Sequence, residues 1–264
     1  MTLLSARGLR GIPEVGVGDD LAALIIEAAG ERPPSAGQVL AIAHKVVSKS
    51  EGALVSLAAV RPSPRARELA AEAQAAGGDE GAKDPRSVQV VLDESAEVLR
   101  AERGVLICRT RHGFVCANAG VDASNSADDD TLVLLPRDPD ASARRIRSRL
   151  RELLAIPRDG PAPAVMITDS FGRAWRHGQL DVAIGLAGMQ PLDDWRGRSD
   201  ARGLRLRATW LAVADAAAAM ADLAREKDSR EPVVLIDGLE RFLTVDDGPG
   251  ASALLRPLAE DLFR

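Results

Sequence analysis

Apolar residues recur along the chain in two patterns: short continuous runs, and runs spaced as on one face of a helix. The continuous runs predict buried strands at residues 39–43, 105–109, 114–117, 131–135, 165–168, 182–187, 204–213 and 233–236. The helical spacing predicts helices at residues 21–28, 64–76, 85–100, 142–154, 214–224 and 251–263. The segment 44–52 fits either a strand or a helix.

The order of these elements indicates the fold class. Strands and helices are interspersed, but without the regular strand–helix–strand alternation of a doubly wound fold. We therefore predict an α+β fold with a mixed, largely antiparallel sheet flanked by helices. We expect one unit over residues 1–264, and a division into subdomains 1–160 and 161–264 stays open. Neither a P-loop nor a dinucleotide-binding fingerprint is present in the sequence.

Two predicted strands run into short stretches of small polar residues, and each stretch contains an aspartate. Residues 113–125 carry Asp122 and Asn125, and residues 165–173 carry Asp169 beside Ser170. Small residues allow the backbone to approach a ligand closely, and carboxylate, amide and hydroxyl oxygens suit a hard cation. The two strand ends could converge on one metal–phosphate site. The alternative is a pair of turns in which these side chains bond to their own backbone.

Basic residues gather in two other places. Lys45 and Lys49 share a face whether their segment is a strand or a helix. Two like charges close together are destabilising unless an anion neutralises them. They could contact phosphate or could be two solvated lysines. The predicted helix 142–154, with Asp140 as its cap, carries five arginines that we interpret as a solvated face.

Composition narrows the class of protein. The 264 residues are 46% hydrophobic and 28% charged, which is typical of a globular protein, and the net charge of −5 argues against a general nucleic-acid binder. The sequence has no membrane-length apolar run and no signal-peptide pattern, so we expect a cytoplasmic protein. Cys108 and Cys116 flank a predicted hairpin turn and are expected to stay reduced. Three histidines and no Cys-x-x-Cys pattern speak against a zinc site.

Several blocks, in a fixed order along nearly the whole chain, resemble one known family. They include Lys45-Val-Val-Ser-Lys-Ser-Glu-Gly52 and Ile167-Thr-Asp-Ser-Phe-Gly-Arg173. The other matching blocks are residues 11–14, 18–21, 113–125, 135–142 and 200–203. Together they resemble the coenzyme F420:L-glutamate ligase family, the γ-glutamyl ligases of deazaflavin cofactor synthesis.

The resemblance implies a reaction and its partners. Members of the family use GTP, L-glutamate and a phospholactyl-deazaflavin precursor, together with two divalent cations, Mg²⁺ or Mn²⁺. An acyl-phosphate route needs no protein nucleophile, and the number of glutamates added is left open. The resemblance also implies an intertwined homodimer.

The resemblance also assigns residues to the site. Asp122 and Asp169 would bind metal, with Ser170 on the second metal where the family usually has threonine. The nucleotide contacts would be Ile12, Pro13, Glu14, Val15, His44, Lys45, Lys49 and Asn125. The loop 225–231 would add nucleotide contacts, with Glu226 or Lys227 near the position of a metal contact.

Two positions depart from the family pattern. Trp210 and Ala216 stand where the family usually carries glutamate. The departures leave open a second interpretation, a non-catalytic paralogue that keeps the nucleotide and metal sites.

Overall fold

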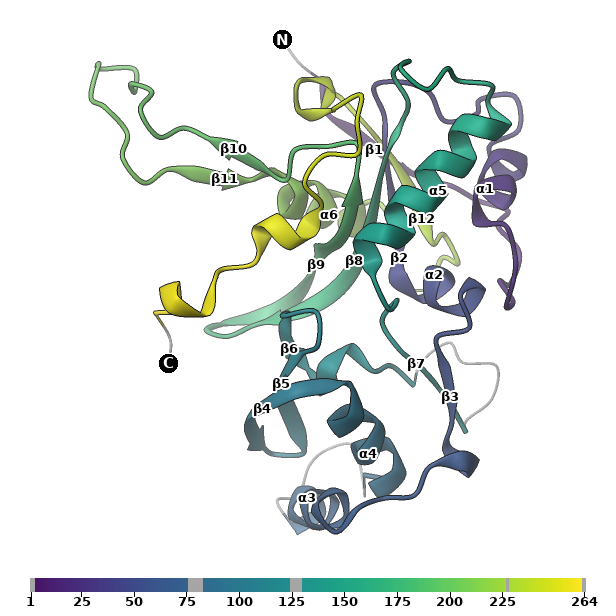
Figure 1. The fold of residues 1–264 in the computed structure, drawn as a ribbon, viewed down its shortest axis with the longest axis vertical. Coiled ribbons are helices and arrows are strands. Elements are labelled where there is room, and N and C mark those ends of the chain that lie inside the picture. Colours follow the sequence, from purple (N-terminus) through teal and green to yellow (C-terminus); the bar gives the residue numbers. More distant parts are fainter. Residues whose placement is uncertain (1–2, 76–82, 124–129, 227, 263–264) are drawn as a thin grey trace.

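The computed structural model describes residues 3–75, 83–123, 130–226 and 228–262. Its centre is a five-stranded sheet in the order β1-β12-β2-β8-β9 (Figure 1). These strands are β1 (Ser5–Gly8), β12 (Val233–Asp237), β2 (Val39–Ala43), β8 (Ala164–Arg173) and β9 (Arg176–Ala187). The pair β2–β8 is parallel, and the other three neighbouring pairs are antiparallel. The predicted mixed, largely antiparallel α+β fold is confirmed, and the sheet takes strands from before and after residue 160.

Helices cover both faces of this sheet, because its strands are apolar on both sides. Leu40 and Ile42 of β2 pack with α1 (Leu21–Ala29), α2 (His44–Ser50) and α5 (Pro139–Leu153) on one face. Val39 and Ala41 point the other way and pack with α6 (Val213–Leu223). Side chains alternate between the faces of a strand, so continuous apolar runs such as 39–43 are what a sheet covered on both sides requires.

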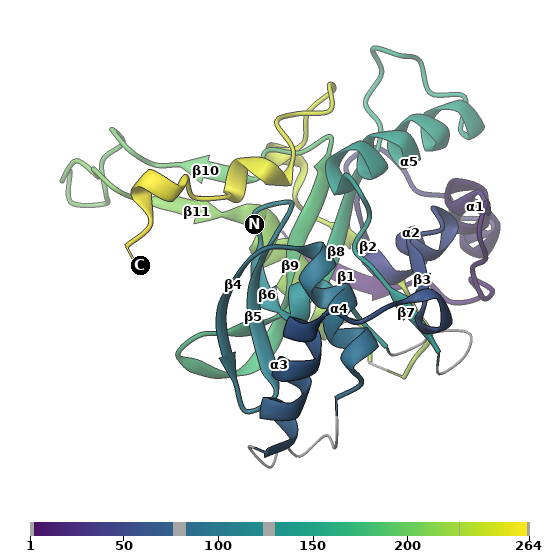
Figure 2. The same ribbon diagram turned by 60° about the horizontal axis from the view of Figure 1, so that its bottom comes forward.

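A second lobe is inserted between β2 and β8 (Figure 2). It contains α3 (Pro64–Ala75), α4 (Pro85–Glu94) and the three-stranded sheet of β4 (Ser95–Glu102), β5 (Val105–Thr110) and β6 (Val115–Ala117). The two-stranded ribbon of β3 (Leu54–Ser56) and β7 (Thr131–Val133) connects it to the central sheet. Outside both lobes, β10 (Leu192–Asp194) and β11 (Trp210–Ala212) form a projecting arm (Figure 1). Short 3₁₀ turns complete the chain at Leu57–Ala59, Asn118–Gly120, Glu240–Phe242, Ala251–Leu254 and Leu258–Glu260.

Three predicted elements are corrected by the structure. The helix predicted over 85–100 ends at Glu94, and Ser95 begins β4, because pairing with β5 overrides the helical spacing. The predicted C-terminal helix is replaced by two 3₁₀ turns separated by Pro257, which has no backbone N–H and disfavours a helical residue before it. The strand predicted over 204–213 is reduced to β11.

The basic helix α5 differs from the prediction at two residues. Its N-cap is Asp138, which accepts a hydrogen bond from the Ala141 N–H, whereas Asp140 is buried and accepts the N–H groups of Leu186, Ala251 and Ser252. Arg147, predicted on a solvated face, is 1% exposed. No helix in the described ranges is long and apolar enough to cross a membrane.

Candidate functional site

The strand order brings segments that are distant in sequence to one edge of the central sheet. Parallel pairing sets Ala43, the last residue of β2, level with Thr168 of β8, so His44 follows β2 beside Asp169. The start of β12 reaches the same edge, where the Ala43 N–H donates to the Pro232 carbonyl. β1 also ends here, since the Leu9 N–H donates to the Val233 carbonyl. We call this edge, where β1 and β2 end beside residues 168–170 of β8, the site edge. Crevices outside the carboxyl ends of parallel strands are common ligand sites.

His44 begins α2 and faces Asp169. Its ring is buried, and Nε2 lies 3.3 Å from Oδ1 of Asp169 while Nδ1 lies 3.4 Å from Oγ of Ser48. Among the described residues, Nε2 has no partner with good hydrogen-bond geometry. A buried polar atom without a good partner is costly, so a ligand at this edge could satisfy His44.

Both predicted lysines of α2 form ion pairs. Lys45 Nζ is 2.7 Å from Oδ2 of Asp122, and Lys49, which is buried, pairs with Glu14. Asp122 is held by backbone hydrogen bonds in both directions with Val133. The structure therefore brings the first acid loop, the second acid strand and α2 together through Lys45 and His44.

The loop 118–122, which carries Asp122, contains residues with positive φ angles. Asn118 and Ala119 have φ angles of 50° and 54°. At Gly120, with φ 71°, a Cβ atom would come within 2.8 Å of the Leu135 side chain. A glycine is required here, since any side chain would collide with the core that supports Asp122.

Consecutive residues of β8 point to opposite faces, which separates the predicted metal ligands Asp169 and Ser170. Asp169 faces His44, whereas Ser170 Oγ donates to Oδ1 of Asp181 at 2.7 Å. Thr168 Oγ1 donates to Oδ2 of the same aspartate at 2.9 Å. Asp181 stands directly opposite Ser170 in the β8–β9 hairpin and also pairs with Arg225. The sequence patterns do not single out Asp181; its only signal is its place just before the apolar run 182–187.

The remaining predicted residues lie as follows. Val15 is buried and Ile12 packs against the same core, whereas Pro13 and Glu14 are exposed and Glu14 pairs with Lys49 of α2. Glu226 is exposed, and its carbonyl accepts both the N–H and the hydroxyl of Ser229. Asn125 and Lys227 lie outside the described residues.

The donor set fits a hard cation shared with phosphate better than a closed metal cage. In the described part of the chain, no group of three or more His, Cys, Asp or Glu side chains is placed to hold a metal ion. Mg²⁺ is usually held by one or two carboxylates, with water and substrate phosphates completing its shell. Asp122 and Asp169 supply carboxylate oxygens of that kind, and Ser170 supplies a hydroxyl that leaves β8 on the opposite side from Asp169. Lys45, which pairs with Asp122, suits phosphate.

Cys116 does not supply a nucleophile to this site. Burial, the nearby charge of Asp169 and Cys108 raise the pKa of the Cys116 thiol to about 12. Cys108 and Cys116 pair across β5 and β6, and both are free thiols. A thiol with so high a pKa is protonated at neutral pH and is therefore inert.

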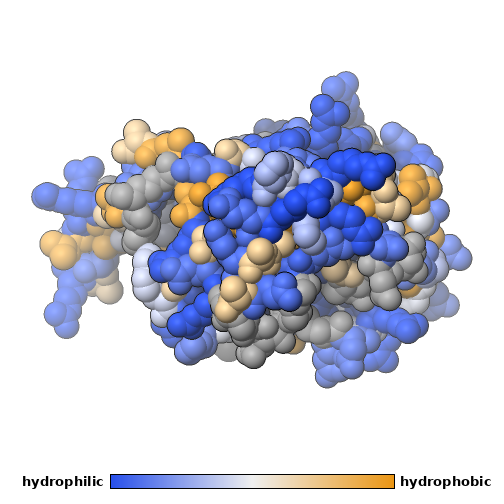
Figure 3. Space-filling model, turned by 90° about the horizontal axis from the view of Figure 1, so that it is seen from below, coloured by the Kyte–Doolittle hydropathy of each residue, from blue (hydrophilic) through white to orange (hydrophobic). Residues whose placement is uncertain are grey.

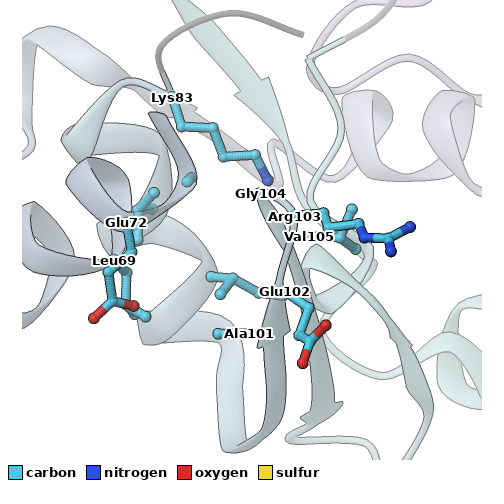
Figure 4. A pocket seen from close by; sticks show the side chains of 11 residues that line it. Leu69, Glu72, Lys83, Ala101, Glu102, Arg103, Gly104 and Val105 are labelled. Carbon is cyan, nitrogen blue, oxygen red and sulfur yellow. The ribbon is translucent and has the colours of Figure 1, made fainter. Parts of the chain in front are cut away.

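The second lobe contains a cavity of about 340 Å³ (Figure 4). It lies between α3 and the β4–β5 hairpin, with Glu72, Lys83, Glu102 and Arg103 among its lining residues. None of the predicted site residues lines it. The cavity is therefore separate from the residues that the sequence predicts for the site.

Comparison with known proteins gives a consistent result. Residues 10–238 match the family model F420-0:Gamma-glutamyl ligase. The chain is 42% identical over 264 residues to the coenzyme F420:L-glutamate ligase of Methanothermobacter thermautotrophicus, covering 99% of each protein. It is 44% identical over 253 residues to the protein of the same name from Methanopyrus kandleri, covering 95% of this chain and 94% of the relative. The match spans the central sheet, the second lobe and the site edge, and this chain belongs to the F420-0:gamma-glutamyl ligase family.

Proposed function

We propose that this chain is a GTP-dependent ligase that joins L-glutamate, through an amide bond, to the phospholactyl-deazaflavin precursor of coenzyme F420. Its membership of the family and the names of its relatives support glutamate ligation. The observation that carries the proposal is the site edge, where Asp122 and Asp169 meet Lys45 and His44 from a separate segment.

The proposed reaction has two steps. A carboxylate oxygen of the acceptor attacks the γ-phosphorus of GTP, the bond to the bridging oxygen breaks, and GDP leaves. The amine of glutamate then attacks the carbonyl carbon of the acyl phosphate. Phosphate leaves with the C–O electron pair, and the amine nitrogen loses a proton. Phosphoryl transfer of this kind depends on positioning and charge stabilisation, so a protein nucleophile is not required.

The residues of the site edge have distinct roles in this proposal. Lys45 and Lys49 would turn from their carboxylate partners to phosphate oxygens, and His44 Nε2 would contact the nucleotide. Asp122 and Asp169 would hold two divalent cations, Mg²⁺ or Mn²⁺, with Ser170. When bound, these cations would neutralise charge that develops on the transferred phosphoryl group.

A direct assay tests the proposal. Purified protein is incubated with GTP, Mn²⁺, L-glutamate and the precursor, and mass spectrometry follows each added glutamate. We expect product with GTP and none when metal is omitted, with ATP in place of GTP as the nucleotide control. Absence of product, with the protein folded and every substrate present, would overturn the ligase assignment.

The departures at Trp210 and Ala216 favour one alternative, a paralogue that binds nucleotide and metal without turnover. Trp210 is half-exposed on the β11 arm under the guanidinium of Arg196, 4.0 Å from its ring centroid, and Ala216 is exposed on α6. Neither side chain has the carboxylate that the family usually carries at its position. Thermal stabilisation by GTP and Mn²⁺ without product would support the paralogue, because a ligand that binds only the folded state raises its stability.

We also propose that the chain works as a homodimer. The β10–β11 arm projects from the body and exposes Leu204 and Leu211 (Figure 1). Seen from below, the surface is mostly hydrophilic with smaller hydrophobic patches (Figure 3). Some of these patches lie at the left of the view, the side to which the arm projects in Figure 1. Light scattering should give twice the 27.9 kDa chain mass, and a monomer at micromolar concentration would contradict the dimer.

A further inference from the structure

Asp181 is a buried carboxylate that belongs to the site edge without being one of its predicted ligands. It is 1% exposed. Its Oδ1 accepts the hydroxyl of Ser170, and its Oδ2 accepts the hydroxyl of Thr168 and pairs with Arg225. These partners come from β8, the strand that pairs with β9 at Asp181, and from the segment after α6.

A buried charge is strongly unfavourable unless it is paired and hydrogen-bonded, and apolar residues of similar volume often serve stability as well. A stabilising role alone therefore does not explain why a charged residue is buried at position 181. The hydrogen-bond pattern suggests a further role. Thr168 donates to Asp181 and accepts from Arg225 at 2.9 Å, so its hydroxyl is engaged in both directions inside the network. Ser170 is the member at the outer end, partly exposed and adjacent to Asp169.

The geometry determines how the Ser170 hydroxyl is presented. An ionised carboxylate only accepts hydrogen bonds, so the hydroxyl hydrogen of Ser170 points at Asp181. The oxygen lone pairs then point away from Asp181, which is the orientation that a hydroxyl needs to bind a cation. Partners behind a metal ligand fix its orientation and raise its basicity.

We propose that Asp181 is a positioning residue of the cation site, which orients the Ser170 hydroxyl as a metal ligand while Arg225 balances its charge. This inference rests on the proposed function, because it assumes that Ser170 contacts a cation. It assigns to Asp181 no contact with substrate or metal.

The test measures Mn²⁺ binding directly, by the loss of the electron paramagnetic resonance signal of free Mn²⁺ in the presence of GDP. Asp181→Asn should weaken Mn²⁺ binding by about 10-fold, the lower end of what such supporting residues contribute. Asp140→Asn is the matched control, because Asp140 is also a buried carboxylate but accepts three backbone N–H groups, from Leu186 of β9 and from Ala251 and Ser252. Both variants should lower Tm, and only Asp181→Asn should change Mn²⁺ affinity.

A double variant separates positioning from an independent effect. If Asp181 acts through Ser170, then Ser170→Ala/Asp181→Asn should bind Mn²⁺ as weakly as Ser170→Ala alone. Should Asp181→Asn fail to fold, Asp181→Asn/Arg225→Met removes both charges together and should show the same loss. Wild-type Mn²⁺ affinity in the folded Asp181 variants would overturn this inference but not the proposed function. Losses of Mn²⁺ affinity that add in the Ser170→Ala/Asp181→Asn variant would do the same. A wild-type protein that binds no Mn²⁺ with GDP would overturn the proposed metal site and this inference together.

Discussion

Replacement of Arg147 by methionine should strongly destabilise the protein, although the residue lies in a run of arginines on α5. All five N–H donors of its buried guanidinium are used. Nε donates to the Pro163 carbonyl, Nη1 to the Asp246 carbonyl and the Asp247 carboxylate, and Nη2 to the carbonyls of Thr244 and Val245. The glycine that follows β9 leaves room for this guanidinium, because a Cβ atom on Gly188 would lie 2.4 Å from Nε of Arg147. The side chain thus fastens the segment 244–247 to the central sheet.

The magnitude follows from which acceptors would lose a donor. The Val245 carbonyl keeps a hydrogen bond from Arg151, and the Asp246 carbonyl keeps one from the Thr244 hydroxyl. Asp247 is half-exposed and can be solvated. The carbonyls of Pro163, which is buried, and Thr244, which is partly buried, would lose the Arg147 donor. An unsatisfied buried acceptor costs about 1–3 kcal/mol, and a partly buried one costs less because water can reach it. Burial of the methionine side chain offsets part of this, so we expect a loss of about 3 kcal/mol.

Thermal unfolding is the assay, with Arg149→Met as the matched control on the same helix. For a chain of this size, about 3 kcal/mol corresponds to a fall in Tm of about 6–12 °C. Arg149 is 46% exposed and pairs with Asp20 and Glu152, contacts that are worth less than about 1 kcal/mol at a surface. Equal Tm changes in the two variants would refute the reasoning, because burial would then not distinguish the two arginines.

Other predictions concern the site edge. Asp122→Asn and Asp169→Asn should each abolish ligation while circular dichroism stays native, because each removes a formal charge with almost no change in volume; turnover at the wild-type rate would exclude that residue from the metal site. Lys45→Met and Lys49→Met should weaken GTP binding by about 1.5–3 kcal/mol in calorimetry, and unchanged affinity would leave them as structural lysines. Cys116 should resist iodoacetamide at pH 8 until the protein is unfolded, since its pKa of about 12 leaves about one thiol in 10⁴ ionised, and rapid labelling of the native protein would contradict this.

Local patterns in the sequence predicted the parts of the site that lie at strand ends. The apolar run 39–43 followed by His44 and Lys45, and the run that ends at Asp169, both carry their own signal. Parallel pairing of β2 with β8 then places these ends together, and this pairing is a long-range property that neither run contains. The same limitation explains why the predicted helix 85–100 includes residues 95–100 of β4: their spacing fits both structures, and the partner strand decides.

Arg147 and Asp181 were missed for a physical reason. The partners of Arg147 are mainly backbone carbonyls, and a carbonyl leaves no mark in the sequence. On helical spacing alone, Arg147 is one member of a basic stretch. Asp181 meets Arg225 and Ser170 only after the hairpin closes and α6 packs across it. Buried polar networks of this kind depend on tertiary contacts, so residue type and spacing do not reveal them.

Under the proposed function, the ion pairs of the site edge couple the binding of metal to the binding of nucleotide. Lys45 is already paired with Asp122, and Lys49 with Glu14. A phosphate that takes Lys45 breaks its ion pair with Asp122, and a metal ion that takes Asp122 breaks the same ion pair. Either ligand alone breaks an ion pair and replaces only one partner, whereas metal and nucleotide together replace both. Binding of each should therefore strengthen binding of the other, by the same factor in both directions, because linkage is reciprocal. Under the proposed function, the ion pair between Lys45 and Asp122 thus favours binding of the metal–nucleotide complex over binding of either component alone.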